Sequence, residues 1–60
     1  MSPAIKVALV DDEVLFRKGI AFLLQREDNI EIIFEASNGE EALEVLARIQ
    51  KPDLIVLLKP

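Results

Sequence analysis

The stretch that decides the fold is residues 5–13, which run Ile5-Lys6-Val7-Ala8-Leu9-Val10-Asp11-Asp12-Glu13. Its first part, 5–10, is almost entirely apolar and contains several β-branched side chains, and it stops at a run of acidic residues. A short apolar run that ends at polar residues is typical of a buried strand followed by a loop. We therefore predict a strand over 5–10 and an acidic loop immediately after it.

The hydrophobic period changes after the acidic loop, and residues 14–26 are predicted to form an amphipathic helix. Its apolar residues fall on one helical face, which we expect to be buried: Phe16, Ile20, Leu23 and Leu24. Gly19 lies inside this helix, where a glycine costs about 1 kcal/mol relative to alanine. We expect Gly19 to permit a close approach between the helix and a strand.

The next part of the chain repeats this alternation. Residues 30–36 alternate apolar and acidic side chains, which suits a half-exposed strand near a sheet edge. A second helix is expected over 40–50, with Asn38 and Glu41 as a capping box at its start. Pro52 stops this helix, because proline cannot continue the backbone hydrogen bonds.

Residues 54–58 are apolar on both faces and predict a third strand that needs layers on both sides. Strands that alternate with helices imply a parallel sheet with right-handed crossovers. The whole chain, 1–60, is thus expected to form one α/β unit of order β-α-β-α-β. It stops after a strand that should be central, which suggests half of a larger domain, and we expect exposed apolar surface unless something covers it.

The composition excludes several classes of site. The chain has no cysteine and no histidine, which rules out disulfides, zinc-finger spacing and histidine-based acid–base catalysis. A net charge of -4 without a basic run makes it a poor nucleic-acid binder by itself. No apolar run approaches the ~20 residues of a membrane span, and the start of the chain lacks the features of a signal peptide. We therefore expect a cytoplasmic protein without membrane contact.

The acidic loop is the best candidate for a ligand site. In open α/β sheets ligands bind at the carboxyl ends of the strands, and Asp11 with Asp12 offers the oxygen ligands that Mg²⁺ prefers. The alternative is structural, because acidic residues also cap helices and favour the positive end of the helix dipole. Both roles can hold at once, with Glu13 as the capping residue. A nucleotide site is weakly supported, because neither glycine-rich phosphate-binding motif is present.

Three motifs, taken in order, resemble the receiver domain of bacterial two-component response regulators, in the version found in LuxR-type transcription factors. They lie at 10–24 around the double aspartate, at 35–43 and at 52–57. The resemblance covers nearly the whole chain. It implies a flavodoxin-like (CheY-like) fold of strand order 2-1-3-4-5, of which this chain would supply strands 2, 1 and 3.

The same resemblance implies a phosphoryl switch. A sensor histidine kinase would phosphorylate an aspartate at the end of the third strand, while Mg²⁺ on the acidic pair neutralises the charge of the transferring group. Asp12 would bind the metal directly and Asp11 through water. The full-length parent would regulate transcription through a C-terminal DNA-binding part that this chain lacks. The first-helix residues that would dock the kinase are Leu15, Arg17, Lys18 and Phe22. A wide buried helix is the alternative explanation of Leu15 and Phe22.

The chain departs from the family pattern at the third strand. The family has Pro-Asp-Leu-Ile-Val-Leu-Asp-Leu-Lys-Met-Pro, whereas residues 52–60 are Pro-Asp-Leu-Ile-Val-Leu-Leu-Lys-Pro. The phosphoacceptor aspartate expected between Leu57 and Leu58 is absent, as is a methionine before Pro60. Asp53 is no substitute, since it lies about 13 Å away at the other end of the strand, where we expect a turn residue. An intact-mass measurement would test whether both residues are missing.

Three hypotheses remain open. In the first, the chain is a receiver-domain fragment that binds Mg²⁺ weakly, cannot accept phosphate and is not an enzyme. In the second, it is a half-domain without chemistry that forms a homo-oligomer through the uncharged, unpaired edge of 54–58. In the third, an unrelated α/β module uses the acidic loop for another ligand, and the motifs at 35–43 and 52–57 are coincidental.

Overall fold

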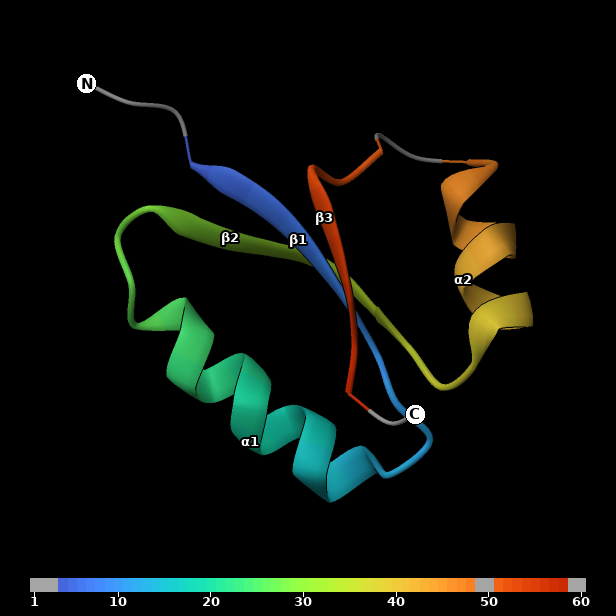
Figure 1. Ribbon diagram of the computed structural model, residues 1–60, viewed down its shortest axis with the longest axis horizontal. Helices are drawn as coiled ribbons and strands as arrows, with labels where there is room; N and C mark the ends of the chain where they lie inside the picture. The colour runs from blue at the N-terminus through green and yellow to red at the C-terminus, as the bar shows by residue number, and fades with distance from the viewer. Residues whose placement is uncertain (1–3, 49–50, 59–60) are drawn as a thin grey trace.

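The computed structural model describes residues 4–48 and 51–58. Strands and helices alternate along this part of the chain: β1 (Ile5–Val10), α1 (Val14–Gln25), β2 (Ile30–Ala36), α2 (Gly39–Leu46) and β3 (Leu54–Leu57) (Figure 1). The strands are parallel and form one sheet in the order β2-β1-β3. The predicted parallel α/β fold, with the first strand between the second and the third, is confirmed.

Most element ends lie within one residue of the predicted positions, and the clear difference is in α2. This helix ends at Leu46 rather than at residue 50. The N–H of Arg48 turns back to the carbonyl of Val45 at 2.9 Å, which is the tighter hydrogen bond of a closing turn. Residues 49 and 50, the last two of the predicted helix, lie outside the described residues.

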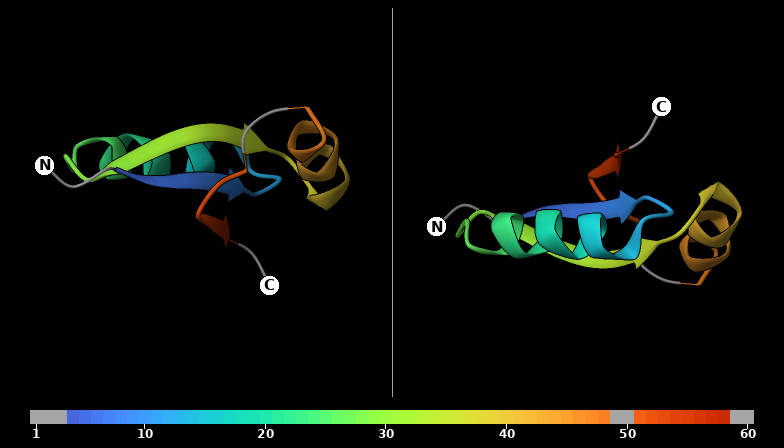
Figure 2. Two further views of the ribbon diagram at one scale, coloured as in Figure 1. Left: turned by 90° about the horizontal axis from the view of Figure 1, so that it is seen from above. Right: turned by 90° about the horizontal axis from the view of Figure 1, so that it is seen from below.

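The two helices pack on opposite faces of the sheet, because successive residues of β1 point to opposite sides. Leu9 of β1 shares one core cluster with Ala21 of α1. Val10 of β1 shares the other cluster with Ala36 of β2 and Ala42 of α2. Figure 2 shows α1 lying along the sheet and α2 beside the end of β2. Leu9 is the largest fully buried side chain among the described residues, so the core is centred on β1.

A β-bulge changes the direction of the side chains along β2. The register of the β1–β2 pair shifts between Val7 and Ala8, which makes Ile33 the extra residue. One extra residue turns every later side chain of a strand to the opposite face. As a result, Glu35 pairs with Leu9 and lies on the face that α1 covers.

α1 buries a different stripe from the predicted one. Its inward-facing residues follow the i, i+3, i+4, i+7 spacing of one helical face: Arg17, Ile20, Ala21 and Leu24. Phe16 and Leu23 are instead 49% and 56% exposed. The prediction is therefore right for Ile20 and Leu24 and wrong for Phe16 and Leu23, because the long side chain of Arg17 fills the inward position nearest the acidic loop.

Gly19 does not bring α1 close to a strand, contrary to our expectation. Beyond the adjoining backbone of its own helix, a Cβ built on Gly19 meets no atom of the described residues within 4 Å, and the residue is exposed. The backbone at Gly19 does not have a positive φ either, so no conformation there requires glycine. Gly19 is therefore a position where the helix loses stability without gaining a contact.

β3 is the least covered strand. Leu54, Ile55 and Leu57 are 53%, 43% and 69% exposed, while Val56 packs partly against the cluster under α1. The predicted exposure of apolar surface is confirmed here, since the described residues cover β3 only in part, whereas a central strand is covered on both faces.

Asp53 fastens the start of β3 to β1. The N–H of Lys6 donates to Oδ2 of Asp53 at 2.9 Å, and the N–H of Asp53 donates to the carbonyl of Lys6 at 2.7 Å. Asp53 thus lies at the amino end of β3, away from the acidic loop, and its carboxylate ties two strands together in addition to starting the strand after a bend.

Candidate metal site at the carboxyl ends of the strands

A hollow of about 280 Å³ opens where β1 and β3 end and α2 begins. The residues that line it come from the loop after β1, the loop before α2 and the last residue of β3: Val10, Asp11, Asp12, Ser37, Asn38, Gly39 and Leu57. Both predicted metal ligands, Asp11 and Asp12, belong to this lining. The arrangement is the expected one for a parallel sheet, whose strands all present their carboxyl ends at the same edge.

Asp11 is held firmly although it lies in a loop. It is only 3% exposed, and its N–H donates to the carbonyl of Ala36 at 3.0 Å, which continues the β1–β2 pairing. Its Oδ1 accepts a hydrogen bond from the N–H of Glu13 at 3.0 Å. Its Oδ2 is buried and accepts no hydrogen bond from the described residues. A buried carboxylate oxygen without a donor is costly, and a bound cation would remove that cost.

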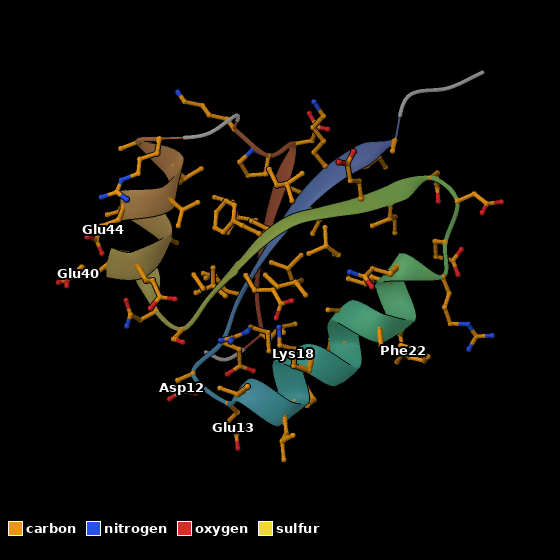
Figure 3. The ribbon with its side chains drawn as sticks, turned by 180° about the vertical axis from the view of Figure 1, so that it is seen from behind. Asp12, Glu13, Lys18, Phe22, Glu40 and Glu44 are labelled. Atoms are coloured by element: carbon orange, nitrogen blue, oxygen red, sulfur yellow. The ribbon has the colours of Figure 1, made fainter. Side chains whose placement is uncertain are left out.

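Asp12 and Glu13 are exposed in the loop that leads into α1 (Figure 3). Glu13 occupies the N-cap position of α1, but its side chain makes no capping hydrogen bond. The expected capping role of Glu13 is therefore wrong. The carboxylate of Asp11 takes that role from two residues earlier, since it accepts from the N–H of Glu13 at the start of the helix.

Arg17 organises the site from behind. It is 8% exposed, and its Nη1 lies 2.6 Å from the carbonyl oxygen of Asp11, 3.1 Å from that of Ala36 and 3.3 Å from Oγ of Ser37. Arg17 is predicted to belong to an exposed docking surface, and its burial removes it from that surface. The i+3, i+4 and i+7 spacing from Arg17 to the inward apolar residues of α1 is the signal that could have revealed this.

Glu35 neutralises Arg17. Its Oε1 forms an ion pair with Nε of Arg17 at 3.0 Å, and its Oε2 forms a second pair with Nζ of Lys18 at 3.2 Å. The Glu35 side chain is 18% exposed and that of Lys18 is 60% exposed. The pair with Arg17 is therefore mostly desolvated, while the pair with Lys18 is at the surface, where ion pairs contribute little. The sequence did not single out Glu35, because the bulge that turns it toward α1 leaves no clear pattern.

The start of α2 forms the far wall of the hollow. Oδ1 of Asn38 accepts from the N–H of Glu41 at 2.8 Å, as the predicted capping box requires. The second hydrogen bond of a capping box would join the carboxylate of Glu41 to the N–H of Asn38. Here that carboxylate accepts from the N–H of Ser37 instead, at 2.8 Å. The cap fixes the loop that carries Ser37, Asn38 and Gly39 against the acidic loop.

The donor set fits a hard divalent cation in part. The buried Oδ2 of Asp11 and the neighbouring carboxylate of Asp12 supply oxygen ligands of the kind that Mg²⁺ prefers. Within 4–48 and 51–58, no three side chains of the metal-binding types come together. The residue that lines the hollow from β3 is Leu57, which offers no ligand. The site could therefore bind a cation through two carboxylates and water.

The other predicted docking residues lie on the outer side of α1. Leu15 and Phe22 are 89% and 66% exposed, and Lys18 lies between them in the sequence of the helix. Figure 3 shows Lys18 and Phe22 on α1. Their spacing of i, i+3 and i+7 places the three on one stripe. The alternative of a wide buried helix is not supported for Leu15 and Phe22.

Neither helix of the described part of the chain is long and apolar enough to cross a membrane.

The sequence of the chain is similar to segments of several known proteins. The chain is 49% identical over 53 residues to a protein-glutamate methylesterase/protein-glutamine glutaminase of Clostridium acetobutylicum, a match that covers 88% of the chain and 15% of the relative. It is 39% identical over 57 residues to the nitrate/nitrite response regulator protein homolog of Haemophilus influenzae, covering 95% of the chain and 27% of the relative. It is 47% identical over 53 residues to the sensory transduction protein LytT of Bacillus anthracis, covering 88% and 21%.

The chain therefore spans between about a seventh and about a quarter of the length of these relatives. No protein-family model and no solved structure matches it. The shared feature of the relatives is a segment that matches nearly all of this chain, although their names describe different activities. These similarities, together with the parallel sheet and the acidic loop, support a segment of a response regulator receiver domain.

Proposed function

We propose that the chain is the receiver segment of a two-component response regulator, and that its acidic hollow binds Mg²⁺ in a phosphorelay. The observation that carries the proposal is the buried Oδ2 of Asp11, which accepts no hydrogen bond from the described part of the chain and lies in a hollow at the carboxyl edge of the sheet. The relatives named as response regulator and sensory transduction proteins support the same assignment.

Asp11 and Asp12 would hold the cation, which supplies charge neutralisation for a phosphoryl group that enters the hollow. Burial of Asp11 limits the access of water to its carboxylate and fixes the orientation of that carboxylate. The exposed side chain of Asp12 can adjust its position to the ligand. The assignment gives this chain a binding role and no catalytic activity of its own. The enzymatic names among the relatives belong to proteins of which the chain spans 15% or less.

The segment as it stands would not accept phosphate. The family resemblance places the phosphoacceptor between Leu57 and Leu58, and the structure puts Leu57 in the lining of the hollow. Insertion of an aspartate between these two residues would therefore bring a third carboxylate to the acidic pair. Without it, the site lacks both a metal ligand and the group that forms the acyl phosphate.

The insertion itself tests the proposal. We expect the chain with an inserted aspartate to bind Mg²⁺ about tenfold more tightly than the unaltered chain, and to gain the mass of one phosphoryl group when incubated with Mg²⁺ and acetyl phosphate. Insertion of asparagine at the same place is the matched control, since it restores the length without the carboxylate. Equal Mg²⁺ affinity for the two insertions would contradict the proposal.

We further propose that the outer stripe of α1, formed by Leu15, Lys18 and Phe22, docks the histidine-bearing helices of a sensor kinase. Leu15 and Phe22 are exposed apolar side chains on either side of Lys18 along α1, and this helix begins directly after the acidic loop, which supports the proposal. In a response regulator that carries this sequence with the aspartate inserted between Leu57 and Leu58, Phe22→Ser should slow phosphorylation by the kinase and leave phosphorylation by acetyl phosphate unchanged. Leu43→Ser, at a position of α2 that is 69% exposed, is the control. An unchanged rate with the kinase would contradict the docking role.

The remaining parts of the proposal concern the longer protein. A LuxR-type regulator would act in the cytoplasm and bind DNA through a separate domain, so that the receiver segment changes transcription indirectly.

The second candidate function is self-association of this chain through β3, which the exposure of Leu54, Ile55 and Leu57 favours. It does not require the acidic hollow, and the two functions are therefore separable by mutation.

A further inference from the structure

Arg17 is buried in a way that packing alone does not explain. Arginine is seldom buried unless its charge is paired, and here Nε is paired with Glu35 while Nη1 lies within hydrogen-bond distance of three oxygens. Those oxygens belong to Asp11, Ala36 and Ser37, which line or border the hollow on two sides. One side chain therefore connects the loop after β1 to the loop after β2.

This connection determines the position of Asp11. Its carbonyl oxygen is held by Nη1 of Arg17 at 2.6 Å, its N–H by the carbonyl of Ala36 at 3.0 Å, and its Oδ1 by the N–H of Glu13 at 3.0 Å. With those three groups fixed, the Asp11 carboxylate has little freedom to turn. Oδ2, which has no hydrogen-bond donor among residues 4–48 and 51–58, is then held in one direction before any cation arrives.

We propose that Arg17 is a positioning residue for the cation site, and that it acts by geometry rather than by charge. This inference rests on the proposed function, since it concerns the same acidic hollow. A positive charge close to a cation site would by itself lower the affinity for Mg²⁺. The ion pair with Glu35 offsets that charge, so that the fixed direction of the Asp11 carboxylate is the effect that remains.

The test compares variants at two neighbouring positions that contact the same carboxylate. Arg17→Lys keeps the charge, but its shorter side chain has a single nitrogen and cannot contact Glu35 and the oxygens of the two loops at once. Arg17→Met removes the charge while filling the space. Lys18→Met removes the other partner of Glu35 without touching either loop. The affinity for Mg²⁺ is measured from the amide NMR signals of Asp11 and Asp12.

We expect both Arg17 variants to bind Mg²⁺ about tenfold more weakly than the unaltered chain, and Lys18→Met to stay within about twofold. Unchanged or tighter binding by Arg17→Lys would overturn the inference, because geometry would then not matter. A loss of the same size in Lys18→Met would also overturn it, because the loss would then come from Glu35 or from the helix surface.

A measurement on the unaltered chain covers the case in which the Arg17 variants do not fold. The Nε–H signal of Arg17 should shift during the Mg²⁺ titration with the same apparent affinity as the Asp11 amide, because the guanidinium contacts the carbonyl of the residue whose carboxylate binds the cation. A stationary Nε–H signal at saturation would overturn the inference while leaving the Mg²⁺ site in place. If no amide of the acidic loop responds to Mg²⁺, the proposed function fails, and the inference fails with it.

Discussion

Two neighbouring strands of the sheet, β1 under α1 and β3 at the edge, both have largely apolar sequences but differ in how far they are buried. On the α1 side, Leu9 is fully buried and a desolvated ion pair between Arg17 and Glu35 closes the end of the core. On the β3 side, Leu54 and Leu57 are more than half exposed. The difference shows that hydrophobic sequence makes a strand but does not by itself make a core, which needs a helix from the same chain to cover it.

The largest expected effect comes from the buried side of this comparison. Leu9→Ala should lower the free energy of unfolding by about 2–5 kcal/mol, because it removes the large side chain around which the core is packed. Leu57→Ala, at a residue that is 69% exposed, should change it by less than about 0.5 kcal/mol. Urea unfolding followed by circular dichroism measures both. Similar losses in the two variants would mean that β3 is covered in solution.

The ion pair at the end of the core should be the next largest contribution. Glu35→Ala leaves the Arg17 guanidinium buried without its charged partner, and we expect a loss of about 1–3 kcal/mol. Glu31→Ala, on the same strand but exposed, is the matched control and should be nearly neutral. If Glu35→Ala left the free energy of unfolding unchanged, the contacts of Arg17 with the carbonyls of Asp11 and Ala36 would be enough to stabilise the buried guanidinium.

The open side makes a prediction about assembly. We expect the chain to self-associate through the unpaired edge of β3, and a charge placed there should weaken the association about tenfold or more. Ile55→Lys supplies that charge, and Ile5→Lys is a close control, because the two isoleucines are 43% and 44% exposed and β1 has no free edge. Sedimentation over a wide concentration range measures the effect. A chain that stays monomeric and unfolds cooperatively would contradict self-association.

The smallest effect is expected at Gly19. Replacing this glycine with alanine should raise the free energy of unfolding by about 0.5–1 kcal/mol, because alanine loses less backbone entropy than glycine when the helix forms. The added Cβ meets no atom of the described residues beyond the adjoining helix backbone. Thermal unfolding would show the gain as a higher midpoint temperature. A loss of stability would mean that the surface of α1 at Gly19 is in contact with something, such as a second copy of the chain.

The order and direction of the elements could be predicted from the sequence, because the hydrophobic period changes sharply at Asp11 and again at Asn38. The location of Asp11 and Asp12 at the carboxyl edge followed from the same order. What could not be predicted is how far each carboxylate is buried, since Asp11 and Asp12 are adjacent and chemically alike. Their difference arises from the pairing of Asp11 with Ala36, which is a contact between distant parts of the chain.

The roles of Arg17 and Glu35 were missed for related reasons. A charged residue within a helix is usually at the surface, so Arg17 was assigned to the exposed side together with Lys18. Only the tertiary structure shows that Glu35 faces it, because the extra residue Ile33 reverses the alternation that the sequence of β2 suggests. Local patterns therefore identified the ligands of the candidate site but not the residues that hold them in place.

The most direct test of the central claim is a titration of the unaltered chain with Mg²⁺, observed through its amide NMR signals. We predict that the signals of Asp11, Asp12 and Glu13 shift together and saturate in the millimolar range, and that Asp12→Asn largely abolishes the response. Two carboxylates and water should bind no more tightly than that while Leu57 lines the hollow in place of a third ligand. Saturation in the micromolar range, or no shift of these signals at all, would contradict the account.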